Sequence, residues 1–332
     1  MTAANYDTAR GTALLEMMER IRAFERQAEL AAIRDQLVLG AIHLSLGQEA
    51  SAAGVIAALR RDDLLLSTHR GHGHTLAKGA DPTAMMAELL GRETGCCGGK
   101  GGSMHIADFD VGMLGANGVV SANIPIGAGA AHGIKLLGDD RIVVNFFGDG
   151  AINRGPFLEG LNWAAVFELP VLFVCEDNEW SATTRTATMT AGAGAAARAQ
   201  SLGLRSESVD GNDVEAVADL ARDLVDAIRN SRQPAFLHAR TFRQSGHTYF
   251  DPASYRSQAE TQARIDADDP IERQRETLQG AGLAKDQLDA IRQAAEAEMV
   301  AALEAAKAAA FPPDESVFAD VQDIGSPERE AF

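Results

Sequence analysis

The feature that most constrains the fold is a regular alternation of apolar runs and amphipathic segments from residue 141 onward. Three short apolar runs, "RIVVNFFG", "PVLFVCED" and "PAFLHARTF", predict strands. The segments between them, "NRGPFLEGLNWAAVFEL" and "VEAVADLARDLVDAIRN", predict helices. Continuous apolar strands that alternate with helices indicate a parallel sheet covered on both faces. We therefore predict an α/β fold with a mostly parallel sheet.

Helical extensions are expected at both ends of this sheet domain. Residues 7–35 have apolar side chains at helical spacing, and residues 285–310 are rich in alanine. The apolar positions of the first segment are Leu14, Met17, Met18, Ile21 and Phe24. The last residues are acidic and are expected to lie over the surface or a partner. We predict an N-terminal extension (1–35), an α/β domain (36–280) and a C-terminal helix with an acidic tail (281–332).

Composition excludes several classes of function. Hydrophobic residues make up 46% of the 332 residues, enough for a sizeable core. The net charge of −17 argues against nucleic acid, whose phosphates bind Lys and Arg. No apolar run approaches the roughly 20 residues that span a bilayer, and the N-terminus does not resemble a secretory signal. Cys96 and Cys97 are adjacent, which is not a zinc spacing, so a reduced, cytoplasmic protein is expected.

Polar side chains follow two neighbouring strands of the predicted sheet. Asp149 ends the first run and Asn178 follows the second, 29 positions later. The carboxyl ends of parallel strands meet at the edge of the sheet where ligands bind, so these side chains are expected to lie together. Both offer oxygen, which magnesium prefers, and Gly148 and Gly150 allow a diphosphate to approach the backbone. The alternative is that Gly-Asp-Gly only turns the chain from strand to helix.

These residues resemble a known family. Gly148-Asp149-Gly150, followed after 26 residues by Asp177-Asn178, is similar to the metal-diphosphate motif of thiamine diphosphate enzymes. Further motifs occur in the order seen in the E1 alpha subunits of pyruvate, branched-chain 2-oxo acid and acetoin dehydrogenase complexes. These motifs are "HLSLGQEA", "HRGHGH", "GKGGSMH", "GANGVVSANIPIGAG", "VDGNDV" and "GHTYFDPASYR". The resemblance covers residues from about 28 to 260 and implies a thiamine diphosphate-binding fold.

The resemblance implies a role for each matching residue. Asp149, the side chain of Asn178 and the backbone carbonyl of Trp180 match the Mg²⁺ ligands. His43 and His247 match histidines at the substrate end of the pocket and are the candidate catalytic residues. The positions that match contacts to the cofactor are His69, Arg70, Gly118, Val120, Gly148, Asp149, Gly150, Ala151, Asn178, Arg243 and His247. Arg is suited to phosphate because its donors form a fork.

The chain also departs from the family pattern. Asp177 stands where two asparagines are usual, so it adds negative charge beside the cation site. His69-Arg70 replaces a tyrosine-arginine pair that is common in pyruvate-specific members and resembles acetoin dehydrogenase alpha chains. Arg154 replaces a usual glutamine. A zinc site at His69, His72 and His74 is not favoured, because no cysteine or carboxylate nearby completes a ligand set.

The resemblance implies partners as well as a reaction. In this family the glutamate that activates the cofactor comes from a separate beta subunit, so an α2β2 heterotetramer is expected, and Glu49 is not expected to replace it. The assembly would cleave acetoin, or decarboxylate a 2-oxo acid such as pyruvate, and pass the acyl group to the lipoamide of an E2 acyltransferase. Acetoin is favoured on "HRGHGH" alone. The alternatives are a transketolase-like, non-oxidative thiamine diphosphate enzyme and a non-catalytic scaffold subunit.

Overall fold

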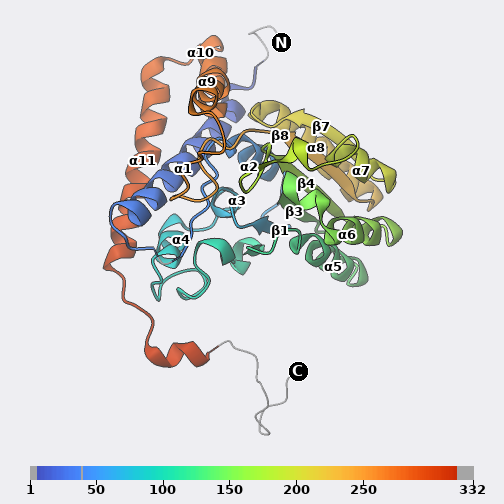
Figure 1. Cartoon of the computed structure of the whole chain (residues 1–332), viewed down its shortest axis with the longest axis horizontal. Helices are drawn as coiled ribbons and strands as arrows, with labels where there is room; N and C mark the ends of the chain where they lie inside the picture. Colours follow the sequence, from blue (N-terminus) through green and yellow to red (C-terminus); the bar gives the residue numbers. More distant parts are fainter. Residues whose placement is uncertain (1–5, 39, 320–332) are drawn as a thin grey trace.

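Within residues 6–38 and 40–319, which the computed structural model describes, six parallel strands form one sheet in the order β2-β1-β3-β4-β8-β7 (Figure 1). The strands are β1 (Leu64–Thr68), β2 (Met113–Asn117), β3 (Val143–Gly148), β4 (Val171–Asp177), β7 (Arg205–Asp210) and β8 (Ala235–Arg240). A short antiparallel hairpin of β5 (Trp180–Ser181) and β6 (Thr184–Arg185) follows β4. The predicted mostly parallel sheet is confirmed.

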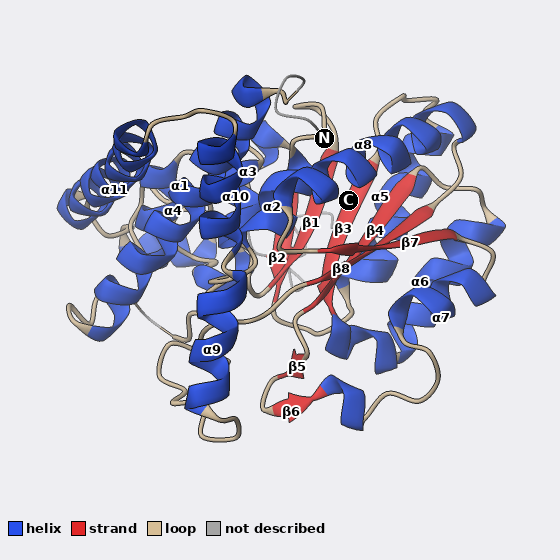
Figure 2. Ribbon diagram, turned by 90° about the horizontal axis from the view of Figure 1, so that it is seen from above, coloured by secondary structure: helices blue, strands red, loops and turns tan. Residues whose placement is uncertain are grey.

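Helices cover both faces of this sheet (Figure 2). One face carries α5 (Asn123–Leu136), α6 (Gly155–Val166) and α7 (Ala195–Ser201). The helices that contribute to the opposite core are α1 (Thr8–Ile33), α2 (Glu49–Ile56), α3 (His72–Ala77), α4 (Pro82–Leu89), α8 (Val214–Ser231), α10 (Pro270–Gly280) and α11 (Lys285–Ala308). The remaining helix, α9 (Gln258–Asp268), buries no residue. No helix among the described residues is long and apolar enough to cross a membrane.

The central strands carry mostly apolar side chains because both of their faces are covered. On β3, Val144 and Phe146 enter the core under α1 and α8, while Val143 and Phe147 enter the core under α5 and α6. Successive side chains of a strand point to opposite faces, so a strand buried on both sides shows a continuous apolar run. This is why β3, β4 and β8 could be predicted from the sequence.

Three strands of the six-stranded sheet escaped prediction. The five-residue run of β1 directly follows the charged segment "RRDD", and β2 is short and contains Gly115. The edge strand β7 has the polar sequence "RSESVD". Edge strands are less buried, and their sequences carry less apolar signal. The sheet therefore extends two strands beyond β3 on one side and ends in β7 on the other.

The two terminal helices predicted from the sequence are present and lie side by side (Figure 1). Helix α1 buries Leu14, Met18, Ile21 and Phe24, as its spacing predicts. Arg20 on α1 forms an ion pair with Glu298 on α11 at 2.7 Å. The acidic tail beyond residue 319 lies outside the described residues.

The glycine-rich segment 91–102 forms turns, as its composition predicts. The carboxylate of Glu88, at the end of α4, accepts hydrogen bonds from four backbone amides of this segment. The donors are the N–H groups of Cys97, Gly99, Gly101 and Gly102, at 2.7–3.0 Å. One buried side chain thus replaces the main-chain partners that a helix or strand would supply.

Candidate functional site

One pocket lies at the carboxyl ends of β1, β2, β3 and β4. The strands β2 and β3 lie on opposite sides of β1, so the connections leaving β1 and β3 diverge there. Ligands of open α/β sheets bind at such a switch point. All the residues predicted for the site line this pocket: His43, His69, Arg70, Gly118, Val120, Gly148, Asp149, Gly150, Ala151, Asn178, Trp180, Arg243 and His247.

Asp149 and Asn178 are buried at the ends of adjacent strands, with exposed fractions of 2% and 6%. Register pairs Gly148 with Glu176, so the next residues along β3 and β4 remain neighbours. Thr186 donates a hydrogen bond to Asp149. Carboxylate and amide oxygens in this arrangement are the donor set of a hard divalent cation.

Gln48 orients the amide of Asn178. Nδ2 of Asn178 donates to Oε1 of Gln48 at 2.9 Å, and Oδ1 of Asn178 accepts from the backbone N–H of Trp180 at 3.2 Å. Because Nδ2 faces Gln48, the amide oxygen is directed to the other side. Gln48 and Thr186 were not among the predicted site residues. Gln48 stands within the quoted "HLSLGQEA", whereas Thr186 lies in a segment without a recognisable motif.

The pKa of Asp149 depends on a second carboxylate, that of Asp177. Burial raises the pKa of Asp149, and the negative charge of Asp177 adds to that shift. Burial also opposes ionisation of Asp177, but the hydrogen bond and charge of His238 outweigh it and lower the pKa of Asp177. Nε2 of His238 lies 2.9 Å from Oδ2 of Asp177. Asp177 is therefore the carboxylate of this pair that remains charged most readily.

Three imidazoles meet at one end of the pocket. The ring centroid of His43 lies 4.5 Å from that of His69 and 4.8 Å from that of His247. Burial, followed by the charge of Arg70, lowers the pKa of these residues to about 3, about 2 and about 4, respectively. The three rings are therefore neutral at pH 7 and offer hydrogen bonding without charge.

Two arginines face the same pocket. Arg70 is 5% exposed, and its guanidinium donates to the carbonyl of Leu44 at 2.7 Å. Arg243 is 1% exposed and donates to the carbonyl of Ala182 at 2.9 Å and to the hydroxyl of Tyr255 at 2.7 Å. Burial, and then the charge of Arg243, lower the pKa of Arg70 to about 9. Within the described part of the chain no carboxylate contacts either guanidinium, and two buried cations in this position favour an anionic ligand. They also oppose a cation at the three imidazoles.

The neighbouring histidines do not converge into a zinc site. His72 contacts Glu25 at 2.9 Å, and His74 contacts Glu176 at 3.3 Å. His69 instead lies with His43 and His247. Carboxylates do reach His72 and His74, but each contacts one histidine in a separate buried pair.

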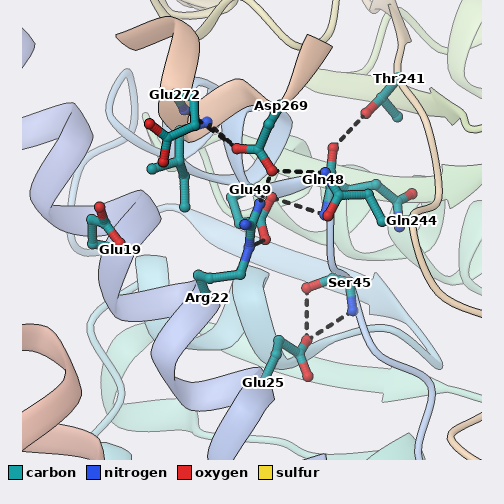
Figure 3. A network of polar contacts seen from close by, with 12 residues as sticks. Glu19, Arg22, Glu25, Ser45, Gln48, Glu49, Thr241, Gln244, Asp269 and Glu272 are labelled. Atoms are coloured by element: carbon teal, nitrogen blue, oxygen red, sulfur yellow. Dashed lines mark hydrogen bonds and ion pairs between the residues drawn. The ribbon is translucent and has the colours of Figure 1, made fainter. Parts of the chain in front are cut away.

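Glu49 is engaged in the fold and is not among the residues that line the pocket; Figure 3 shows it beside Arg22. It is fully buried, pairs with Arg22 of α1, and accepts from the backbone N–H of Gly47 at 3.0 Å. Arg22 also contacts Asp269 at 3.1 Å. Breaking a buried ion pair on one side is strongly destabilising, which gives Glu49 a structural role.

The glycines of the Gly-Asp-Gly turn differ in their surroundings. A side chain at Gly150 would collide with Ser181, so close packing of the β5 segment already requires glycine there. A side chain at Gly148 would meet the carbonyl of Glu176 at 3.9 Å, an ordinary contact. Packing within the protein therefore explains the glycine at position 150 but leaves the glycine at position 148 unexplained.

Comparison with known proteins identifies the family. The sequence model of the dehydrogenase E1 component matches residues 16–315. The chain belongs to the dehydrogenase E1 component family. Its curated relatives within this family include the alpha subunit of acetoin:2,6-dichlorophenolindophenol oxidoreductase from Cupriavidus necator. That relative is 40% identical over 305 residues, which cover 92% of this chain and 91% of the relative.

Other relatives in the dehydrogenase E1 component family carry two different names. The alpha subunit of acetoin:2,6-dichlorophenolindophenol oxidoreductase from Bacillus subtilis is 41% identical over 260 residues, 78% of each chain. The pyruvate dehydrogenase E1 component subunit alpha from Zymomonas mobilis is 36% identical over 313 residues, 93% of this chain and 88% of the relative. The chain is therefore similar both to alpha subunits named for acetoin and to alpha subunits named for pyruvate.

Membership of the dehydrogenase E1 component family implies thiamine diphosphate, and the pocket suits it. Among the described residues, four buried polar atoms of the lining have no hydrogen-bond partner within the protein. They are Nδ1 of His43, Nε2 of Gln48, Nε1 of Trp180 and Nε of Arg243. At least three of these carry hydrogen, so the pocket presents unused donors to an electron-rich ligand.

Proposed function

We propose that the chain is the alpha subunit of an E1 dehydrogenase that binds Mg²⁺ and thiamine diphosphate in this pocket. The observation that carries the proposal is the position of Asp149 and Asn178, buried at adjacent strand ends beside Arg70 and Arg243. Asp149, the side chain of Asn178 and the carbonyl of Trp180 would hold the cation. When bound, the cofactor supplies an electron sink for cleavage beside a carbonyl group.

The remaining cofactor contacts follow from the pocket lining. Arg70 and Arg243 would contact the diphosphate, because a buried guanidinium stabilises phosphate oxygens. His69, Gly148, Gly150 and Ala151 would line the diphosphate region. Gly118 and Val120 would meet the aminopyrimidine through their backbone.

His43 and His247 are proposed to act at the substrate end. Both rings are neutral, so each can donate one hydrogen bond to a substrate oxygen and accept another while remaining uncharged. Together with His69 they add uncharged polar groups to this end of the pocket, next to the guanidinium of Arg70. Uncharged donors and acceptors suit the carbonyl and hydroxyl groups of a ketol such as acetoin, and acetoin remains the favoured substrate over pyruvate. The oxidised acyl group would pass to lipoamide of an E2 component, whose disulfide accepts the two electrons.

A beta subunit is proposed to complete the site in an α2β2 heterotetramer. The carboxylates among the described lining residues are Asp149 and Glu176. Asp149 belongs to the proposed cation site, and Glu176 is tied to His74 and Ser51. Neither is free to activate a cofactor, which favours a glutamate from another chain.

An exposed apolar surface supports the expectation of a partner. Its residues lie at the pocket rim, where Val119 and Val120 are exposed, and on or directly after α5 and α6. Its members are Val119, Val120, Ile126, Leu136, Leu137, Leu158, Trp163, Val166 and Phe167. Leu136 and Leu137 are each nearly 80% exposed. Apolar patches of this kind mark protein contact sites more often than free surface.

The test is cofactor binding by the chain assembled with its beta partner. Asp149→Ala should abolish Mg²⁺-dependent binding of thiamine diphosphate in isothermal titration calorimetry, because it removes the anionic ligand proposed for the cation. Turnover of acetoin, pyruvate and branched 2-oxo acids with an artificial electron acceptor would then rank the substrates. An Asp149→Ala assembly with unchanged cofactor affinity would refute the proposed site.

A further inference from the structure

The cation site has a second carboxylate directly behind the first. Register pairs Gly148 with Glu176, which places Asp149 and Asp177 side by side on the same face of the sheet. Asp177 lies outside the pocket lining, whereas Asp149 is part of it. Asp177 therefore lies next to the proposed cation site but does not line it.

Asp177 is held in place from two directions. Oδ2 lies 2.9 Å from Nε2 of His238, and Oδ1 accepts from the backbone N–H of Glu179 at 3.3 Å. Nδ1 of His238 lies 3.1 Å from Oγ of Ser208 on the edge strand β7. Because an ionised Asp177 only accepts, Nε2 of His238 carries hydrogen, and a neutral ring then accepts at Nδ1 from the serine hydroxyl. This chain from β7 through β8 to β4 fixes the carboxylate without covering its side toward Asp149.

Two carboxylates side by side repel unless a positive charge lies between or beside them. The ring of His238 donates one hydrogen bond to Asp177, and among the described side chains the hydroxyl of Thr186 donates one to Asp149. A divalent cation at Asp149 and Asn178 would relieve the repulsion that remains. The gain is larger than for a site with one carboxylate, because the interaction scales with the product of the charges.

We propose that Asp177 is a positioning residue that raises the affinity of the Asp149 and Asn178 site for a divalent cation through its charge, without being a ligand. This inference rests on the proposed function of the pocket. It assigns a role to a residue that the cofactor contacts leave unused, and it makes His238 the group that keeps Asp177 aligned.

The experiment uses the chain assembled with its beta partner and Mn²⁺ as the probe, with binding followed by electron paramagnetic resonance in the presence of thiamine diphosphate. Asp177→Asn keeps the shape of the side chain and removes the charge. We expect its dissociation constant for Mn²⁺ to rise about tenfold at low salt. The difference from wild type should shrink as KCl is raised to about 0.5 M, because salt screens charge but does not replace a ligand.

Two further variants make the result decisive. Ser208→Ala, at the far end of the chain from Asp177, should keep Mn²⁺ affinity within about twofold of wild type. Asp177→Ser provides a second uncharged variant if the asparagine assembly is not folded, as judged by circular dichroism and gel filtration. Unchanged Mn²⁺ affinity in the uncharged variants would overturn the proposal. Loss of binding as complete as in Asp149→Ala, at every salt concentration, would also overturn it by making Asp177 a ligand.

The two proposals fail in different ways. If Asp149→Ala leaves Mn²⁺ and cofactor binding intact, the cation site itself is wrong. If Asp149→Ala abolishes binding while Asp177→Asn has no effect, the site stands and only the role of Asp177 is refuted.

Discussion

Nη2 of Arg70 lies 3.1 Å from Nδ1 of His247 and 2.9 Å from the carbonyl oxygen of the same residue. A guanidinium group only donates hydrogen bonds, so Nδ1 of His247 must be the acceptor. In the neutral ring the hydrogen is then on Nε2. Arg70 thereby selects the tautomer of His247 that can donate from Nε2.

This relationship gives His247 a testable role. His247→Ala should lower turnover of the α–β assembly by roughly 10² or more, the usual scale for a positioned proton donor. Folding and assembly should survive, because residues 241–257 form neither helix nor strand and the ring contributes little to the core. Steady-state kinetics measures the effect, with gel filtration as the control. Full activity in a normally assembled variant would leave His43 as the remaining histidine at the substrate end.

Gln48 should matter for cofactor binding although it is not a proposed ligand. Gln48→Met removes the acceptor for Nδ2 of Asn178 and keeps a similar volume, so the amide loses its fixed orientation. We expect thiamine diphosphate affinity to fall about tenfold in calorimetry, with little change in melting temperature, because the loss corresponds to about one hydrogen bond. Gln233→Met, at an exposed position, is the matched control. Equal affinities for the two variants would contradict this role.

Glu49 should behave as a structural residue. Glu49→Gln leaves buried Arg22 with Asp269, at 3.1 Å, as its remaining charged partner, and we expect a loss of about 3 kcal/mol in the free energy of unfolding, the lower end for such pairs. Cofactor affinity of molecules that remain folded should be close to normal.

The same view of Glu49 predicts that the purified chain alone is inactive with acetoin, pyruvate and branched 2-oxo acids. A turnover assay tests this prediction on the isolated chain. The stability of the Glu49→Gln variant is measured separately, by denaturant titration. Robust turnover by the chain alone would mean that an internal carboxylate activates the cofactor.

His69 should make the chain sensitive to acid. Its pKa is about 2 in the folded chain, where it faces Arg70, His43, His247 and Arg243, and about 6.5 when unfolded. Below pH 6.5 the unfolded state therefore binds a proton that the folded state does not, and stability falls as pH decreases. The contribution of one such residue is about 1.4 kcal/mol per pH unit.

The His69→Gln variant should therefore lose stability less steeply than wild type between pH 6.5 and about pH 4.5. Between pH 7 and pH 5 the free energy of unfolding of His69→Gln should therefore fall by about 2 kcal/mol less than that of wild type. His132→Gln, on α5 away from the pocket, should follow the wild-type slope. Denaturant titrations of the full chain at several pH values provide the measurement. Parallel slopes for His69→Gln and wild type would contradict the depressed pKa.

The part of the site that could be predicted rests on strand ends. Asp149 and Asn178 follow two strands whose apolar runs are unmistakable, and parallel pairing then requires their side chains to lie together. The three imidazoles come from segments far apart in sequence, and only the family resemblance placed His43 and His247 in one region. The structure adds His69 to that pair as a ring contact.

The rest of the site depends on contacts that leave no local pattern. Gln48 acts through the amide of Asn178, 130 positions away, and His238 acts through Asp177, 61 positions away. A single polar residue in an apolar strand, such as His238 in "AFLHAR", carries no indication of its partner. Strands β1 and β7 were missed for a related reason, since one follows a charged segment and the other is a polar edge.

Glu88 shows how a loop can be specified from outside itself. The four hydrogen bonds that its side chain accepts come from main-chain amides of residues 97–102, so one carboxylate on α4 fixes the path of that loop together with its glycines. Gly98, Gly99 and Gly102 have positive φ, and a side chain at Gly99 or Gly101 would collide with backbone atoms. The loop leads directly into Met104, which lines the pocket. Mutations that spare Glu88 and these glycines can therefore alter the surface beside the pocket while the pocket wall keeps its shape.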